Sequence, residues 1–296
     1  MTTRARSAHA GGGGPSDLPT FLIIGAAKAG TTFLYERLAT HPDIYMSRIK
    51  ETNFLARDLM AGNPSPVRTE ADYRAQFAPG RHAIARGEAS PVYLRLAEVA
   101  RRAARDLPWI RVVATLRDPV ERAYSDYLML VRKGREDAPP ETALVPGSSY
   151  LDGGFYYRQL RPWLDALGSE RVLVVLLEDL RGTDDAWPRI LTHLGVAPTG
   201  LAPHAGGAVN PGGLPRHPRL SRWLAHPALL RVAAPLTPAP VARLYDRLRA
   251  RGLRPAPPLP AAVRRRLAAL YRDDVEQLGA FLGRDLGHWL REPSSA

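Results

Sequence analysis

Residues 20–34 read TFLIIGAAKAGTTFL, and this stretch decides the fold class. Thr20–Gly25 is a short apolar run between a proline and a glycine, which is typical of a strand buried on both faces. From Thr31 to Ala39 the apolar residues follow helical spacing, with Leu34 and Leu38 four positions apart. A glycine-containing loop therefore joins a buried strand to the start of a helix.

The loop from Gly25 to Thr32 has the chemistry of an anion site. The first N–H groups of a helix have no partner within the helix, and the helix dipole adds positive potential there. Gly25 and Gly30 allow tight turning and close approach of the backbone. Thr31 and Thr32 add hydroxyl donors, and Lys28 adds a cation. Taken alone, the loop is also consistent with an ordinary turn that carries an exposed lysine.

The spacing within this loop differs from two common phosphate-binding patterns. The Walker pattern has its lysine directly after the second glycine, followed by Ser or Thr, whereas here Lys28 precedes Gly30. The dinucleotide fingerprint needs three glycines at GxGxxG spacing, which the loop lacks. The loop therefore predicts a phosphate-type site of another class.

The rest of the chain alternates between short apolar runs typical of buried strands and stretches with the apolar spacing of helices. We expect further strands at Ile44–Met46, Ala83–Arg86, Arg111–Thr115 and Arg171–Leu177, and helices at Tyr93–Arg105, Pro119–Arg132, Phe155–Leu167 and Asp185–Leu194. This order predicts the α/β class: a mostly parallel central sheet flanked by helices, forming a P-loop-like nucleotide-binding core.

Composition changes toward the C-terminus suggest how this core is organised. We expect a flexible tail over residues 1–17 and a single domain over residues 18–292. Thirteen of the 28 prolines lie between Pro198 and Pro260, which predicts an irregular, Pro-rich helical cap within that domain. Short amphipathic pieces interrupt this cap, and a closing helix follows it; the ranges are Arg219–Leu230, Val241–Arg249 and Ala262–Leu282.

The overall composition narrows the classes of function. The formal net charge is +12, and nearly all the positive charge is arginine, because lysine occurs only at Lys28, Lys50 and Lys133. The chain has no cysteine, which excludes disulfides and thiolate catalysis, and its histidines show no metal-ligand spacing. The longest apolar runs are of strand length, too short to cross a bilayer. We expect a cytoplasmic protein without a metal or a transmembrane segment.

A second candidate site lies in residues 111–127. The strand expected at Arg111–Thr115 leads to Arg117, then to Asp118 and Pro119, a good N-cap and a good first helical residue. In α/β proteins ligands bind at the carboxyl ends of strands, where an arginine can fork onto a phosphate. Ser125 lies two helical turns further on. Pairing of Arg117 with Asp118 or Glu121 is the alternative.

These two segments resemble the PAPS-dependent sulfotransferase family, whose donor is 3′-phosphoadenylyl sulfate (PAPS). Residues 23–34 are similar to the family's 5′-phosphosulfate loop, with Ala29 where serine is common, and residues 116–127 are similar to its 3′-phosphate segment. The resemblance covers about residues 18–195, more loosely to 290. It implies that the donor site is formed by Lys28, Ala29, Gly30, Thr31, Thr32, Arg117 and Ser125.

A third segment resembles the carbohydrate-type branch of the family, which includes the heparan sulfate sulfotransferases. Lys50-Glu51-Thr52-Asn53-Phe54-Leu55 is similar to the branch's Lys-Glu-x-His-Phe-Phe stretch, with Asn53 in place of histidine. The resemblance implies that Glu51 is the general base, and a neighbouring lysine favours its ionised form. Glu88 in a further family-like segment is a candidate for acceptor contact or for structural hydrogen bonding, and Arg216 is a candidate to close over the donor.

The resemblance implies in-line transfer of a sulfuryl group from PAPS to a hydroxyl or amine, with PAP as product and no metal. Lys28 and Glu51 would be the catalytic pair. A glycan, a glycolipid or a small secondary metabolite fits as acceptor, and nucleic acid is not expected as a partner. Two other classes stay open: a P-loop-type kinase or NTPase, with Asp118 or Asp179 holding a metal, and a basic nucleic-acid-binding protein.

Overall fold

The protein is described by a computed structural model that covers residues 15–60, 65–182, 186–202, 214–215 and 253–291. Most of the expected tail and of the cap over 198–260 lies outside these residues. The expected pieces Arg219–Leu230 and Val241–Arg249, and the candidate Arg216, also lie outside them.

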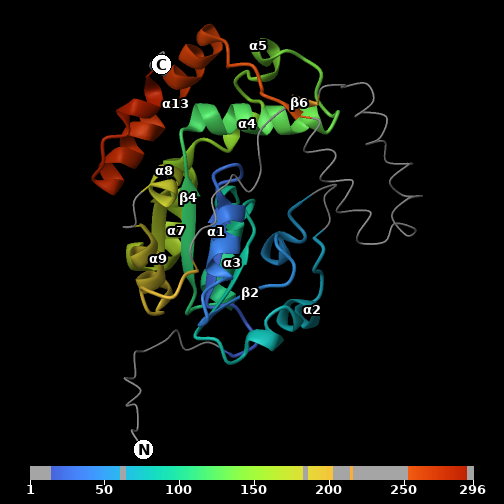
Figure 1. The fold of residues 1–296 in the computed structure, drawn as a ribbon, viewed down its shortest axis with the longest axis vertical. Coiled ribbons are helices and arrows are strands. Elements are labelled where there is room, and N and C mark those ends of the chain that lie inside the picture. Colours follow the sequence, from blue (N-terminus) through green and yellow to red (C-terminus); the bar gives the residue numbers. More distant parts are fainter. Residues whose placement is uncertain (1–14, 61–64, 183–185, 203–213, 216–252, 292–296) are drawn as a thin grey trace, which may run out of the picture. The chain divides into compact units, whose positions relative to one another are not determined.

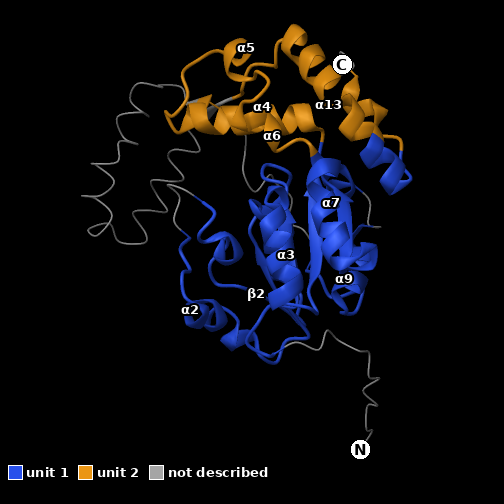
Figure 2. Ribbon diagram, turned by 180° about the vertical axis from the view of Figure 1, so that it is seen from behind, with its two compact units in different colours: residues 1–117, 156–206, 277–284 blue, residues 118–155, 207–276, 285–296 orange. Residues whose placement is uncertain are grey.

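The chain groups into two compact units, coloured separately in Figure 2. The first contains residues 1–117, 156–206 and 277–284, and the second contains residues 118–155, 207–276 and 285–296. Each unit is described by itself. The expectation of one domain over residues 18–292 stays a prediction.

A five-stranded, wholly parallel sheet forms the centre of the first unit (Figure 1). Its strands lie in the order β2-β3-β1-β4-β5. They are β1 (Phe21–Gly25), β2 (Ile44–Met46), β3 (Ala85–Ala89), β4 (Arg111–Leu116) and β5 (Val172–Leu176). The predicted α/β class with a parallel central sheet is confirmed.

Four of the strands follow the sequence prediction closely, but β3 is displaced. It was expected at Ala83–Arg86 and lies at Ala85–Ala89, with all five residues buried. Its sequence, ARGEA, includes Arg86 and Glu88, which have low strand propensity. Pairing with strands on both sides holds these residues in the sheet, and the Arg86 guanidinium donates to the carbonyls of Leu18 and Ala83.

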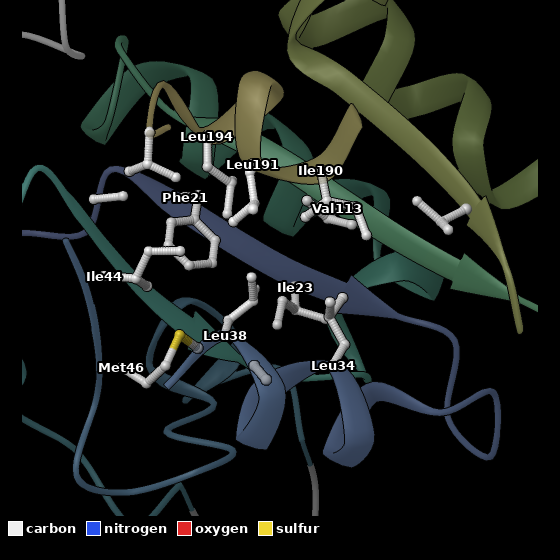
Figure 3. Close-up of a cluster of buried hydrophobic side chains, with 14 of the residues drawn as sticks. Phe21, Ile23, Leu34, Leu38, Ile44, Met46, Val113, Ile190, Leu191 and Leu194 are labelled. Carbon is white, nitrogen blue, oxygen red and sulfur yellow. The ribbon is translucent and has the colours of Figure 1, made fainter. Parts of the chain in front are cut away.

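One face of the sheet carries a cluster of buried apolar side chains, in which α1 (Thr31–Leu38) and α9 (Ala186–Leu194) lie against the strands (Figure 3). Phe21 and Ile23 of β1 point to this face because alternate residues of a strand point the same way. The helices contribute Leu34, Leu38, Ile190, Leu191 and Leu194, all of them buried. This packing fixes where α1 begins.

The opposite face is covered by α3 (Ala97–Asp106) and α7 (Tyr156–Leu167), which pack on each other. Parallel strands are joined by right-handed crossovers. The connection from β1 to β2 and that from β3 to β4 run in opposite directions along the sheet, so their helices cover opposite faces. The prediction of a single helix over Tyr93–Arg105 is wrong in one respect. A 3-10 turn, η3 (Tyr93–Arg95), precedes α3, because Leu96 has an extended backbone and caps α3.

Shorter elements connect these parts of the first unit. They are η1 (Phe54–Ala56), α2 (Glu70–Ala75), η2 (Ala78–Gly80), η4 (Ser169–Arg171) and α8 (Leu177–Arg181).

The second unit is built on α4 (Pro119–Arg132), which has the predicted bounds. Asp118 caps this helix as expected, since its carboxylate accepts the N–H groups of Val120 and Glu121 at 2.8 and 3.2 Å. The other described elements are α5 (Pro140–Ala143), α6 (Ser149–Asp152), β6 (Leu214–Pro215), β7 (Leu253–Arg254), η6 (Gly287–Leu290) and, up to Glu276, α13 (Ala261–Leu282).

His193 on α9 gives the first unit a predicted pH dependence. Burial, reinforced by the charge of Arg111, lowers the pKa of His193 to about 4, below the usual 6.5. Between these two values the unfolded chain binds a proton that the folded chain does not. The free energy of unfolding should therefore fall as the pH drops from 6.5 to 4, by about 2 to 3 kcal/mol.

Urea unfolding at pH 7, 5 and 4 measures this effect. His193→Gln should flatten the pH dependence by that amount, because the new side chain does not titrate. An unchanged slope in the variant would assign the acid sensitivity to other groups.

Candidate functional site

The topology of the first unit singles out the carboxyl end of β1. The chain leaves β1 toward β2 on one side, and it leaves β4 toward β5 on the other, although β1 and β4 are neighbours. This is the switch point of a doubly wound sheet, where open α/β folds bind their ligands. The loop after β1 and Arg117 after β4 both follow strands that end there.

The loop between β1 and α1 presents the start of a helix with a glycine as its cap. Gly30 is the N-cap of α1 and, as a glycine, has no side chain that could bond the first amides of the helix. The first intrahelical bond runs from the N–H of Leu34 to the carbonyl of Gly30, so the N–H groups of Thr31 and Thr32 have no partner in the helical ladder. Thr31 is buried and Thr32 is half-buried. Ala29 contributes less, because its N–H donates to Ala26 at 3.1 Å.

Two glycines of the loop are required by packing. A Cβ atom on Gly30 would lie 2.5 Å from Leu177 Cδ1, and one on Gly25 would lie 2.6 Å from Leu94 Cβ. Gly30 also has a φ of 90°, in the left-handed region that favours glycine. Lys28 has a φ of 68°, which is uncommon for a residue with a side chain. The loop is therefore tightly packed and sharply turned, as close approach to an anion requires, and its donors fit a phosphate.

Arg117 contacts the same loop. Its Nη1 donates to the backbone carbonyl of Lys28 at 3.3 Å, and its side chain is half-buried. Asp118 and Glu121, which were its alternative partners, each bind Arg264 of the second unit, at 2.7 and 2.6 Å. Ser125 is half-buried on α4 in the second unit. Joint binding of a 3′-phosphate by Arg117 and Ser125 stays a prediction.

Glu51 follows β2 and is held beside the end of β3. Its N–H donates to the carbonyl of Ala89 at 2.9 Å. Its carboxylate is half exposed, at 52%, and Oε1 pairs with Lys50 Nζ at 2.7 Å. Glu51 also has a positive φ of 63°, and Asn53 one of 52°. Left-handed conformations of residues with side chains cost free energy and are often found at functional sites.

The fully buried carboxylate of Glu88 lies beneath this segment. Four hydroxyl groups donate to it: Thr52 and Ser90 to Oε2, and Tyr73 and Tyr93 to Oε1. Burial raises the pKa of Glu88 because it disfavours the charged form, while the four hydroxyl bonds oppose that rise. Glu88 is therefore the hub of a buried network and has no exposed surface to offer an acceptor.

Comparisons with known proteins agree with this geometry. The fold is similar to the crystal structure of a sulfotransferase from Alicyclobacillus acidocaldarius, with a TM-score of 0.69 and 26% identity over 92% of this chain and 99% of that one. The sequence is 27% identical over 201 residues to a bifunctional heparan sulfate N-deacetylase/N-sulfotransferase 2 from Bos taurus. The chain is thus similar to sulfotransferases in both fold and sequence. No family model matches it.

The chain spans only part of the length of the curated relatives it matches. The match covers 61% of the chain and 22% of the Bos taurus protein. A second relative is the heparan sulfate glucosamine 3-O-sulfotransferase 3B1 of Mus musculus, 30% identical over 163 residues, or 52% of this chain and 40% of that protein. Because the matches cover so little of these relatives, the activity and substrates of the present chain are treated below as a proposal.

The two aspartates that a kinase-like mechanism would need are bound to arginines in this protein. Asp118 pairs with Arg264, and Asp179 pairs with Arg284 through both carboxylate oxygens. Among the described residues, no group of three or more His, Asp or Glu side chains is placed to hold a metal ion. No helix in the described part of the chain is long and apolar enough to span a membrane.

Most of the hydrogen-bond network around Glu88 was not predictable from the sequence. Glu88 was a candidate for two roles, but Thr52, Tyr73, Ser90 and Tyr93 were not recognised as its partners. Tyr73 lies 15 residues from Glu88 and Thr52 lies 36 residues away. A glutamate within a short segment that also carries serine and tyrosine was the one available signal.

Proposed function

We propose that this protein is a sulfotransferase, which moves a sulfuryl group from PAPS to a hydroxyl or amine of its acceptor. The observation that carries the proposal is the glycine-capped loop from Gly25 to Thr32, with Lys28 within it and Arg117 donating to it, at the switch point of the sheet. This arrangement provides backbone N–H groups, a helix N-terminus and two cations for one anionic ligand.

The donor is bound by two groups of residues. The N–H groups at the start of α1 and the hydroxyls of Thr31 and Thr32 bind the 5′-phosphate. Arg117 and Ser125 bind the 3′-phosphate, with the guanidinium of Arg117 forking onto its oxygens.

Transfer is an in-line displacement, so orientation and electrostatics supply most of the rate. Glu51 removes the proton from the acceptor oxygen or nitrogen as that atom bonds to sulfur. The bond between sulfur and the bridging oxygen of the 5′-phosphosulfate breaks, and Lys28 stabilises the negative charge that remains on that oxygen. The proton ends on Glu51. Its carboxylate is half exposed, which leaves it open to an acceptor.

A glycan is the favoured acceptor class. The two curated relatives are named for N-sulfation and 3-O-sulfation of heparan sulfate, that is, for an amine and a hydroxyl of a sugar. A glycolipid or a small secondary metabolite remains the alternative, because acceptor pockets are formed by variable loops. Within the described part of the chain, residues 57–60, 65–78 and 134–151 are the candidates for such loops.

Calorimetric titration tests the donor assignment. PAP should bind, and ADP, which lacks the 3′-phosphate, should bind about 10- to 100-fold more weakly, because a hydrogen-bonded charge contributes about 1.5–3 kcal/mol. Arg117→Ala should weaken the binding of PAP and leave that of ADP nearly unchanged.

The ADP titration also serves as the control for Arg117. Since Arg117 bonds to the Lys28 carbonyl, its removal can loosen the loop as well. Equal losses for PAP and ADP would show that Arg117 acts through the loop alone. Preference for ATP with magnesium over PAP would replace the proposal with a kinase-type function.

A further inference from the structure

The proton positions around Glu88 follow from simple counting. A serine, threonine or tyrosine hydroxyl has one hydrogen to donate, whereas an ionised carboxylate only accepts. Four hydroxyls lie within bonding distance of the Glu88 oxygens, two on each. An ionised Glu88 satisfies all four, so each hydroxyl hydrogen points at the carboxylate. The lone pairs of the hydroxyls then point away from it.

Three of these hydroxyl oxygens accept hydrogen bonds from backbone N–H groups of the segment that follows Glu51. The N–H of Asn53 donates to Ser90 Oγ at 3.1 Å, that of Phe54 to Thr52 Oγ1 at 3.4 Å, and that of Leu55 to Tyr93 Oη at 3.1 Å. Three successive amides at the start of η1 are thus bound by hydroxyls that the same carboxylate orients. These are groups that a helix start leaves without a partner.

The backbone around Thr52 is also held by a contact outside the Glu88 network. The carbonyl of Thr52 lies 2.5 Å from Ser65 Oγ, whose single hydrogen it shares with the carbonyl of Val67, and Ser65 is itself buried. Glu51 and Asn53 keep their left-handed conformations on either side of Thr52. Such conformations persist only where surrounding contacts determine them.

We propose that Glu88 is a positioning residue for Glu51. Through the hydroxyls of Thr52, Ser90 and Tyr93 it holds residues 52–55, and so fixes the direction in which the base at position 51 presents its carboxylate to the acceptor. The inference rests on the proposed role of Glu51 as the base. A displacement of about 1 Å in such a group lowers the rate by up to about 100-fold.

Tyr73 and Tyr93 provide a matched pair for the test. Both are fully buried tyrosines whose hydroxyls donate to Glu88 Oε1, at 2.8 and 3.1 Å. Only Tyr93 also accepts an amide of the segment, that of Leu55. Substitution by phenylalanine removes the hydroxyl oxygen from either residue. Both variants therefore lose a bond to Glu88, but only Tyr93→Phe also loses the bond to the Leu55 N–H. Glu88→Gln disturbs all four bonds at once and also threatens folding.

The experiment measures amide hydrogen exchange over residues 50–57 and the kinetics of sulfuryl transfer in both variants. Tyr93→Phe should speed exchange of the Leu55 amide and lower kcat by about tenfold, with the KM for PAPS unchanged. Tyr73→Phe should leave the exchange of this peptide and kcat within about threefold of the unchanged protein.

Two results would overturn the proposal: the same exchange and kcat in both variants, or faster exchange in Tyr93→Phe without a loss of kcat. A wild-type protein that fails to transfer sulfuryl groups would refute the proposed function and the catalytic half of this inference. The exchange comparison would still decide whether the hydroxyl of Tyr93 anchors the segment.

Discussion

Lys28→Ala is expected to lower the turnover of PAPS by about 100-fold or more, comparable to the loss of one oxyanion donor in other enzymes. Negative charge develops on the oxygen between sulfur and the 5′-phosphate as the donor bond breaks. Lys28 lies in the loop between β1 and α1, and its left-handed backbone turns the loop sharply at that residue. Removing the ammonium leaves the N–H groups of α1 in place, so PAP should still bind.

Lys133→Ala is the matched control for this substitution. Lys133 is an exposed lysine at the C-terminal end of α4, in the second unit. The same chemical change there should leave turnover within about twofold of wild type. Near-normal turnover in Lys28→Ala, measured at saturating PAPS, would remove Lys28 from the mechanism.

Glu51→Gln is expected to lower kcat by about 100-fold or more, because a positioned base contributes about 10²- to 10⁴-fold to a rate. The amide keeps the size of the side chain but does not take up a proton. The backbone of Glu51 stays bonded to Ala89, so the fold and PAP binding should be unchanged. Loss of PAP binding in this variant would show that Glu51 is structural.

Glu70→Gln provides the control for a lost surface ion pair. Glu70 is exposed at 68% and pairs with Arg74 at 2.8 Å, much as Glu51 is half exposed and pairs with Lys50 at 2.7 Å. Exposed pairs contribute about 1 kcal/mol or less to stability. Glu70→Gln should therefore keep full turnover, and an equal loss in both variants would assign the effect to general surface charge.

The parts of the fold that follow from local periodicity were predictable. The buried strand before Gly25 and the helix after Gly30 are continuous in sequence, and Asp118 with Pro119 marks the start of α4. The displaced strand β3 was not predictable from its own residues, because Arg86 and Glu88 are stabilised by partners elsewhere in the chain.

The same distinction applies to the candidate site. Lys28 and Glu51 could be proposed because each lies in a short continuous motif. The bond from Arg117 to the Lys28 carbonyl joins residues 89 positions apart, and Arg264 is 146 positions from Asp118. Contacts of this range depend on the packing of distant elements, which no local pattern in the sequence describes.

The most direct test of the proposed function is a PAPS turnover assay with a panel of sugar hydroxyl and amine acceptors. PAP should be released in step with sulfation of at least one acceptor, and Lys28→Ala should abolish most of this release while Lys133→Ala should not. An unchanged pool of PAPS across the panel, or PAP release that does not depend on Lys28, would contradict the proposed function.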